Sequence, residues 1–131
     1  MRGFVDDIEA LTEGNPNFRR VLYTGKKLQL VLMSLRPGED IGEEVHDDHD
    51  QFFRVEEGEG EVWIDGRMSG IKSGMAVVVP AGARHNVKNI GGEPLKLHTI
   101  YGPPEHEEGT VHATKADALA SEEHFAGVTT E

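Results

Sequence analysis

The amino-acid sequence predicts an all-β protein of the sandwich or barrel type. Short strand-forming segments follow one another from residue 18 to residue 101, and turn-forming residues separate them at close spacing. The dipeptide Asp65-Gly66, which lies between two such segments, is the sharpest hairpin signal. No helical segment stands between successive strands, so the chain lacks the βαβ alternation of a parallel sheet. These patterns together indicate antiparallel sheets that form a sandwich or a barrel.

The first expected element is a short helix over residues 5–13. Apolar residues recur there at every third position, and acidic residues occupy its first turn. Gly14 and the turn-forming residues 15–17 should end this helix. A second helix is expected at about residues 115–125, because Thr114 can cap its N-terminus. The tail that holds this second helix has few large apolar residues, so it should pack on the barrel or on a partner subunit.

Short strands are expected between the two helices, and most of them are bounded by glycine, proline or aspartate. They cover residues 18–24, 28–35, 41–46, 51–56, 60–64, 67–72, 76–79, 85–90 and 95–101. Gly58 and Gly60 suit the backbone bends of a curved sheet. The strands should therefore build a barrel over about residues 18–101.

The composition limits the size, location and partners of the protein. At 131 residues, the chain is long enough for one domain with a single core. Acidic residues outnumber basic ones 24 to 13 and the formal net charge is −11, a balance that disfavours nucleic-acid and membrane partners. There is no cysteine, which excludes disulfides and thiolate metal sites. With no signal-like segment and no apolar run of membrane-spanning length, a cytoplasmic location is expected.

One motif lies in the second half of the strand region. Its residues are Gly74, Pro80, Gly82, His85 and Asn89, spaced as G-x5-P-x-G-x2-H-x3-N. At every position this pattern resembles the second conserved motif of the cupin superfamily.

Another motif lies earlier in the chain. It resembles the first conserved cupin motif, which usually reads G-x5-H-x-H-x4-E-x6-G. This chain supplies Gly38, Glu44, His46, Gln51 and Gly58 at the same spacings. Two of the usual ligands differ, because Glu44 replaces the first histidine and Gln51 replaces the glutamate. The resemblance implies a single cupin domain over residues 1–131, built as a double-stranded β-helix or jelly roll. It also implies a homodimer, and a small single-domain cupin of the mannose-6-phosphate isomerase-like grouping.

Carried over by motif position, the resemblance places Glu44, His46, Gln51 and His85 around one point inside the barrel. Alternation along a strand supports part of this arrangement, because residues two apart, such as Glu44 and His46, point to the same face. Two histidines and one carboxylate form a ligand set for one divalent ion, with Mn, Fe, Zn and Ni not distinguished. Gln51 is a weaker oxygen donor that either binds the metal or holds a water or a substrate hydroxyl.

Two alternatives to this site stay open. A metal-free polar network is one, although burying Glu44 without a cation is costly. A displaced site that uses His49 is the other. The acidic run of residues 47–50 favours a solvated turn, which would place His49 at the rim of the barrel.

Further residues are candidates for a substrate pocket, although a position on the sheet surface or at an interface is favoured for His98. They are Phe53, His98, Tyr101, His106 and His112. Arg54 and Arg84 each neighbour an inward position and should point outward. No basic residue is therefore clearly placed inside the barrel to bind a phosphate.

Three functions are consistent with the sequence. The first is a metal-dependent enzyme that acts on a small polar, sugar-like or oxygenated metabolite by isomerisation or by Fe(II)-type oxygen chemistry. The second is a non-catalytic module that binds a sugar or another small molecule. The third is a metal-free structural barrel.

Overall fold

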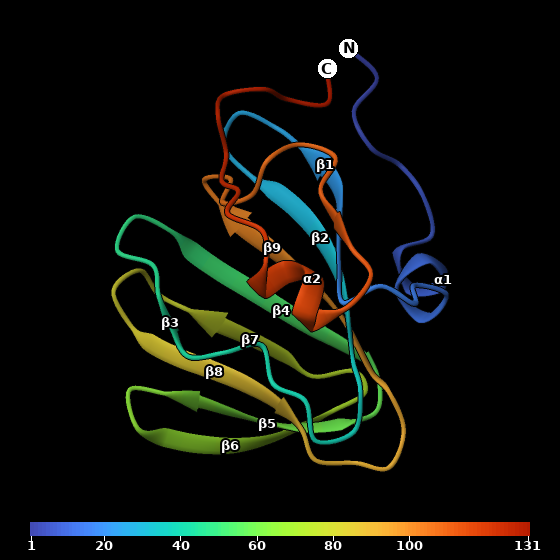
Figure 1. The fold of residues 1–131 in the computed structure, drawn as a ribbon, viewed down its shortest axis with the longest axis vertical. Helices are drawn as coiled ribbons and strands as arrows, with labels where there is room; N and C mark the ends of the chain where they lie inside the picture. Colours follow the sequence, from blue (N-terminus) through green and yellow to red (C-terminus); the bar gives the residue numbers. More distant parts are fainter.

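Two antiparallel sheets face each other in the computed structural model, which describes residues 1–131 (Figure 1). The larger sheet has the order β10-β1-β2-β9-β4-β7, with β1 (Arg19–Thr24), β2 (Gln29–Leu35), β4 (Asp50–Glu57), β7 (Ala76–Val79), β9 (Leu95–Gly102) and β10 (Val111–His112). The smaller sheet has the order β3-β8-β5-β6, with β3 (Glu44–Val45), β5 (Glu59–Ile64), β6 (Arg67–Lys72) and β8 (Arg84–Asn89). The predicted all-β jelly roll is confirmed.

The predicted turns lie where the backbone has to bend. Gly58 has a φ of +92°, and a Cβ atom there would lie 2.7 Å from the carbonyl oxygen of Pro94. This glycine stands where the chain leaves β4 in the larger sheet and enters β5 in the smaller one, so a side chain would obstruct the crossing. Asp65 and Gly66 join β5 to β6 with φ values of 47° and 80°. Positive φ at both positions is what a type I′ hairpin turn requires.

Apolar side chains from both sheets fill the space between them. The hydrophobic core contains 16 buried residues, among them Val31, Phe53 and Leu97. Polar side chains also lie buried in the protein, including Gln51, His85 and Arg19. Because buried polar groups need partners, these side chains mark the region where function is to be sought.

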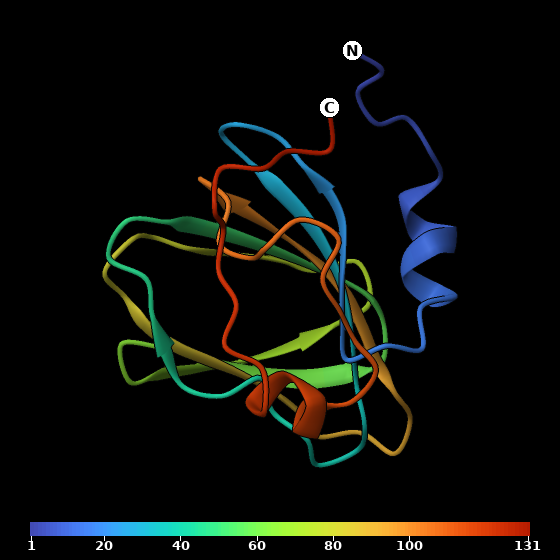
Figure 2. The ribbon, with the colours of Figure 1, turned by 45° about the horizontal axis from the view of Figure 1, so that its top comes forward.

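Helix α1 (Ile8–Glu13) lies outside the barrel, against the larger sheet (Figure 2). Its N-terminus is capped by Asp7, whose Oδ1 accepts from the amide of Ala10 at 3.0 Å. Helix α2 (Lys115–Leu119) begins with the expected capping box of Thr114. It ends six residues earlier than the predicted residue 125, because the residues beyond it bind another segment. The amide of Phe125, for example, donates to the carbonyl of Glu105 at 2.9 Å.

The tail after β9 passes over the side of the barrel between the β1–β2 hairpin and β3 (Figures 1 and 2). It ends beside the N-terminus, where the Glu131 carboxylate accepts from the amides of Arg2 and Gly3 at 2.9 and 2.7 Å. The tail thus packs on the barrel, one of the two arrangements expected for it. Neither α1 nor α2 has the length and apolar character of a membrane-spanning helix.

Candidate metal centre

The structure brings together the four residues that the motif positions indicate. Glu44 on β3 pairs in register with His85 on β8, and His46 follows directly after β3. One ligand atom from each of these three residues lies within 4.8 Å of the others. Gln51, near the start of β4, places its Oε1 3.1 Å from His85 Nε2. A carboxylate, two imidazoles and an amide oxygen therefore converge between the two sheets.

Glu44 and His46 form a short charge-assisted contact, with 2.7 Å between Oε2 and Nε2. Burial raises the pKa of the Glu44 carboxyl. The hydrogen bond from His46 and the positive charges of His46, Arg19 and His85 lower this pKa by more, so the net shift is downward. The hydrogen bond to Glu44 raises the pKa of His46 despite burial, and the charges of Glu44 and Glu105 add to the rise. The proton shared by Glu44 Oε2 and His46 Nε2 thus lies between two atoms that can both bind a cation.

His85 and Gln51 show a different kind of polar contact. The carbonyl of Ala83 lies 3.1 Å from His85 Nδ1, and a carbonyl only accepts, so Nδ1 carries a proton. The Nε2 atom of a neutral ring then presents its lone pair to Gln51 Oε1. The Gln51 amide nitrogen donates to Thr99 Oγ1 at 3.0 Å, and its oxygen faces His85. Two acceptors face each other, and either a second proton on His85 or a cation beside both of them stabilises the arrangement.

His49 lies at the edge of this cluster, not within it. Its Nε2 is 3.0 Å from the carbonyl of Pro104 and 3.2 Å from Glu105 Oε2, so this nitrogen donates to the tail. Glu105 Oε2 also lies 3.6 Å from His46 Nδ1. His46, His49 and Glu105 form a second group whose ligand atoms lie within 4.8 Å of one another. The alternative site that uses His49 therefore has a geometric counterpart, and it includes Glu105, which the sequence did not indicate.

Tyr101 and His106 lie next to the cluster. The His46 ring packs edge-on against Tyr101 with 5.8 Å between ring centroids, and the His106 ring does so at 5.2 Å. The Tyr101 hydroxyl is 3.3 Å from His106 Nε2, and His106 Nδ1 is 2.6 Å from Glu123 Oε1. A hydrogen-bonded chain therefore runs from the tail to the side of the candidate centre. Glu123 belongs to this chain although nothing in the sequence pointed to it.

The other pocket candidates fall in different places. Phe53 is a core residue whose ring lies 6.4 Å from the His85 ring, so it forms a wall beside that ligand. His98 lies under α1 on the outer face of the larger sheet, with its Nδ1 3.3 Å from Thr12 Oγ1. It is therefore apart from the cluster, because alternation along β9 gives it the face opposite to Tyr101. His112, on β10, contacts Arg19.

Arg19 corrects the expectation that no basic side chain clearly lies inside the barrel. Arg54 and Arg84 do point outward, with 46% and 65% of their side chains exposed. Arg19, in contrast, is only 7% exposed. It lies on β1 opposite Met33, a core residue of β2, and therefore on the inner face of the sheet. The signal was present in the sequence, because strand alternation places Arg19 with the apolar Val21.

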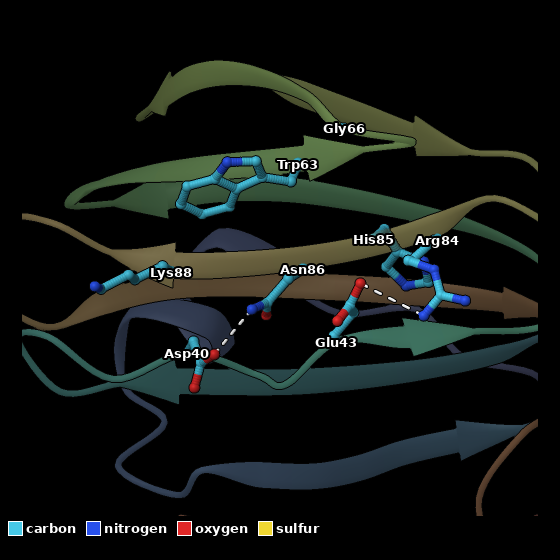
Figure 3. Close-up of a pocket in the computed structure, with 8 residues that line it drawn as sticks. All are labelled: Asp40, Glu43, Trp63, Gly66, Arg84, His85, Asn86 and Lys88. Atoms are coloured by element: carbon cyan, nitrogen blue, oxygen red, sulfur yellow. Dashed lines mark hydrogen bonds and ion pairs between the residues drawn. The ribbon is translucent and has the colours of Figure 1, made fainter.

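The outer face of the smaller sheet carries a separate hollow of about 460 Å³ (Figure 3). Its lining residues are Asp40, Glu43, Trp63, Gly66, Arg84, His85, Asn86 and Lys88. Both of its acidic groups already have partners, since Glu43 pairs with Arg84 and Asp40 accepts from Asn86. Alternation along β8 turns Asn86 away from the buried His85, so the hollow and the cluster lie on opposite faces of the strand.

Comparison with known proteins identifies the class to which this fold and cluster belong. Residues 31–101 match the cupin domain family, and the chain is therefore a member of the cupins. It is 49% identical over 126 residues to YrkC of Bacillus subtilis (strain 168), described as uncharacterized, with 92% of this chain and 68% of that protein covered. It is 41% identical over 123 residues to protein L612 of Acanthamoeba polyphaga mimivirus, also described as uncharacterized, with 90% and 76% covered.

A crystal structure of BH2720 from Bacillus halodurans is similar over almost the whole fold. Its TM-score is 0.89 at 50% identity, and the match covers 92% of this chain and 96% of that one. TT1209 from Thermus thermophilus superposes with a TM-score of 0.68 at 28% identity, covering 76% and 96%. These similarities support the jelly roll and the family, whereas the function has to be argued from the site.

Proposed function

We propose that this cupin binds one divalent metal ion through Glu44, His46 and His85, with Gln51 as a fourth and weaker donor. The observation that carries the proposal is the convergence of acceptor atoms, above all the His85 Nε2 and Gln51 Oε1 atoms that face each other at 3.1 Å. A cation turns that opposition into two favourable contacts. Two imidazoles and a carboxylate also suit Fe(II), Mn(II) or Zn(II) with positions left open.

The surroundings of the two histidines support the same assignment. A histidine that binds a metal through one ring nitrogen usually donates from the other to a carbonyl or a carboxylate. His85 has the carbonyl of Ala83 at its Nδ1, and His46 has the carboxylate of Glu105 on its Nδ1 side. In this assignment, Glu105 and His49 orient His46 from outside the metal-binding set.

We further propose that the centre acts on a small, polar, oxygenated metabolite. A divalent ion bound at this site would supply a Lewis acid or an oxygen-binding centre, chemistry that suits isomerisation of a sugar-like molecule or Fe(II)-type oxygen chemistry. The protein's own contribution is a group that handles protons beside the centre, and this group favours an enzyme over a passive binding module.

That group is the chain formed by Tyr101, His106 and Glu123. Burial raises the pKa of Tyr101, and the negative charge of Glu44 raises it further, so the hydroxyl stays protonated near neutral pH. Because His106 Nδ1 donates to Glu123, the Nε2 atom accepts from the Tyr101 hydroxyl. Tyr101 can therefore pass its hydroxyl proton to His106 while it accepts a proton from a substrate, so that it ends as a neutral phenol, and the Glu123 carboxylate stabilises the imidazolium that forms.

The proposal is tested by metal analysis of protein purified without chelator and without a histidine tag. We expect close to one divalent ion per chain in the wild type, and loss of most of it in Glu44→Ala and in His85→Ala. His124→Ala is the matched control, because it removes an exposed histidine of the tail and should keep the metal. Circular dichroism of each variant checks that the barrel remains folded.

Unchanged metal content in both site variants would overturn the assignment. If the wild type contains iron, oxygen consumption is the assay to screen with candidate metabolites. If it contains manganese or zinc, isomerase and lyase assays are appropriate. A wild type that neither retains nor takes up a divalent ion would instead favour a metal-free binding or structural barrel.

A further inference from the structure

Arg19 is a buried cation without a carboxylate partner. Its side chain is 7% exposed, and it takes part in none of the ion pairs of the structure. Its hydrogen bond runs from Nη1 to His112 Nδ1 at 3.3 Å, and its Cζ lies 5.3 Å from the centre of the Phe18 ring. The Nε atom is buried and has no partner. The charge of Arg19 reaches Glu44 and Glu123, but neither carboxylate forms an ion pair with it. Burying an ionised group without a contacting counter-charge is costly, so this position is suited to an anion.

The unpaired side of the guanidinium group has the geometry of an anion-binding edge. Nε and Nη2 form one edge of the fork, and neither of them donates to a protein atom. Nε is the one fully buried side-chain atom that lacks a partner. Nη2 also lacks a partner but is not among the fully buried atoms, so part of its surface is exposed. Two parallel N–H groups on one edge match the two oxygens of a carboxylate or a phosphate.

His112 serves as a weak substitute for such an anion. Burial lowers the pKa of His112, and the positive charge of Arg19 lowers it further, so the ring stays neutral and accepts the Nη1 hydrogen bond. A neutral imidazole offers no counter-charge to Arg19. An oxyanion would supply that charge, and because Nε is enclosed, it reaches the Nε–Nη2 edge only when the Arg19 side chain shifts.

Arg19 lies inside the same barrel as the candidate metal centre. It pairs with Met33 on the inner face of the larger sheet, and Tyr101 on the same face packs against His46 with 5.8 Å between the ring centroids. The guanidinium group and the acceptor cluster therefore belong to the same interior.

We propose that Arg19 binds the carboxylate or phosphate group of a small anionic ligand whose other oxygen atoms reach the centre formed by Glu44, His46 and His85. The second half of this statement rests on the proposed function, whereas the anion-binding role of Arg19 does not. The proposal narrows the substrate class from a polar metabolite to an organic acid or a phosphorylated molecule.

The test measures binding of glycolate and of inorganic phosphate by NMR titration of the full chain, first in chelator-treated protein and then with metal added. Ethylene glycol is the uncharged comparison for glycolate. The variants are Arg19→Met and Arg19→Lys, and Arg20→Met is the matched control because Arg20 is the exposed neighbour on the same strand. Circular dichroism confirms that each variant is folded.

We expect saturable binding of at least one anion, and none of ethylene glycol, by the wild type and by Arg20→Met. Arg19→Met should bind that anion about 10-fold to 100-fold more weakly, the range for losing hydrogen bonds to a charged group. Arg19→Lys, which keeps the charge but loses the fork, should fall between them. A preference for glycolate identifies a carboxylate ligand, and a preference for phosphate identifies a phosphorylated one.

The proposal is overturned if the wild type binds neither anion in either form, or if Arg19→Met binds as the wild type does. Should Arg19→Met fail to fold, an unchanged affinity in Arg19→Lys overturns it equally. Anion binding that depends on Arg19 in a protein that takes up no metal would support this inference while refuting the metal centre. A retained metal without Arg19-dependent anion binding would do the reverse.

Discussion

Two carboxylate–histidine pairs pack against the ring of Tyr101, and they have nearly the same geometry. The Glu44–His46 contact is 2.7 Å long and the Glu123–His106 contact is 2.6 Å long. The first pair belongs to the β3 region of the barrel and leaves 31% of the Glu44 side chain exposed. The second pair joins two parts of the tail, and its side chains are only 9–10% exposed.

The neighbours of each pair decide what it can do. Beside Glu44 and His46 lie the lone pairs of His85 and Gln51, so the first pair can bind a cation. The Glu123 carboxylate accepts a second hydrogen bond, from the amide of Glu107 at 2.7 Å, and His106 accepts from Tyr101. The polar atoms of the second pair thus all have hydrogen-bond partners and need no cation. The same two side chains form a candidate ligand set in one place and a structural and proton-carrying contact in the other.

The largest expected difference between the pairs is in metal affinity. His46→Ala removes a proposed ligand, so its affinity should fall by more than the roughly 10-fold to 100-fold that loss of an outer-shell partner costs. His106→Ala should bind the metal almost as the wild type does, because Tyr101 separates His106 from the ligand set. Competition titration with a chelator measures both constants. Equal losses in the two variants would show that the pairs do not differ in this way.

The next largest effect is on folding stability. Glu123→Ala should lower the free energy of unfolding of the metal-free protein by about 1.5–3 kcal/mol, the contribution of a hydrogen bond to a charged group. Urea unfolding measures the change. Glu122→Ala, an exposed neighbour in the tail, is the control and should stay within about 0.5 kcal/mol of the wild type. A loss of the same size in the control would mean that the tail tolerates no change, and not that the Glu123–His106 contact is special.

The smallest effect concerns the pH dependence of stability. Burial raises the pKa of Glu123, but hydrogen bonds from His106 and from the amide of Glu107, with the charges of His106 and Arg19, lower it to about 2 from an ordinary value of 4.5. A carboxyl with a lowered folded-state pKa stabilises the fold above its unfolded pKa and loses this contribution as the pH falls.

The difference in unfolding free energy between the wild type and Glu123→Gln should therefore be constant above pH 4.5 and shrink toward pH 2. Urea unfolding at a series of pH values gives this difference directly. Because other carboxyl groups titrate in both proteins, they cancel. A difference that does not change with pH would mean that the pKa of Glu123 is the same in the folded and unfolded protein. The pair would then not be a charged contact.

The sequence predicted the first pair and missed the second for a physical reason. Glu44 and His46 are two residues apart in one predicted strand, where alternation indicates a shared face, and the motif spacing adds His85 and Gln51. Glu123 and His106 are brought together by the path of the tail, which local patterns do not determine. The predicted helix over residues 115–125 would itself have carried Glu123 elsewhere.

Arg19 was missed for a different reason. Alternation with Val21 indicated the inner face, but a buried arginine is so rarely tolerated that an outward position is the usual expectation. The burial of Arg19 therefore points to a functional role, since a charged residue in the protein interior is expected mainly where a site requires it. Most strand positions and the hairpin at Asp65-Gly66, in contrast, follow local rules and were confirmed. The strand expected over residues 41–46 is shorter in the structure and covers Glu44–Val45 only.

The contact of Glu131 with Arg2 and Gly3 has a consequence for engineering. It holds the two ends of the chain side by side, so a short linker could join them without moving a strand. New ends could then be opened at the exposed hairpin of Asp65 and Gly66, which lies beside the start of β8, because the Arg84 amide donates to Asp65 Oδ1 at 2.9 Å. Such a circular permutant would move both ends of the chain from the tail side of the barrel to the β5–β6 hairpin of the smaller sheet.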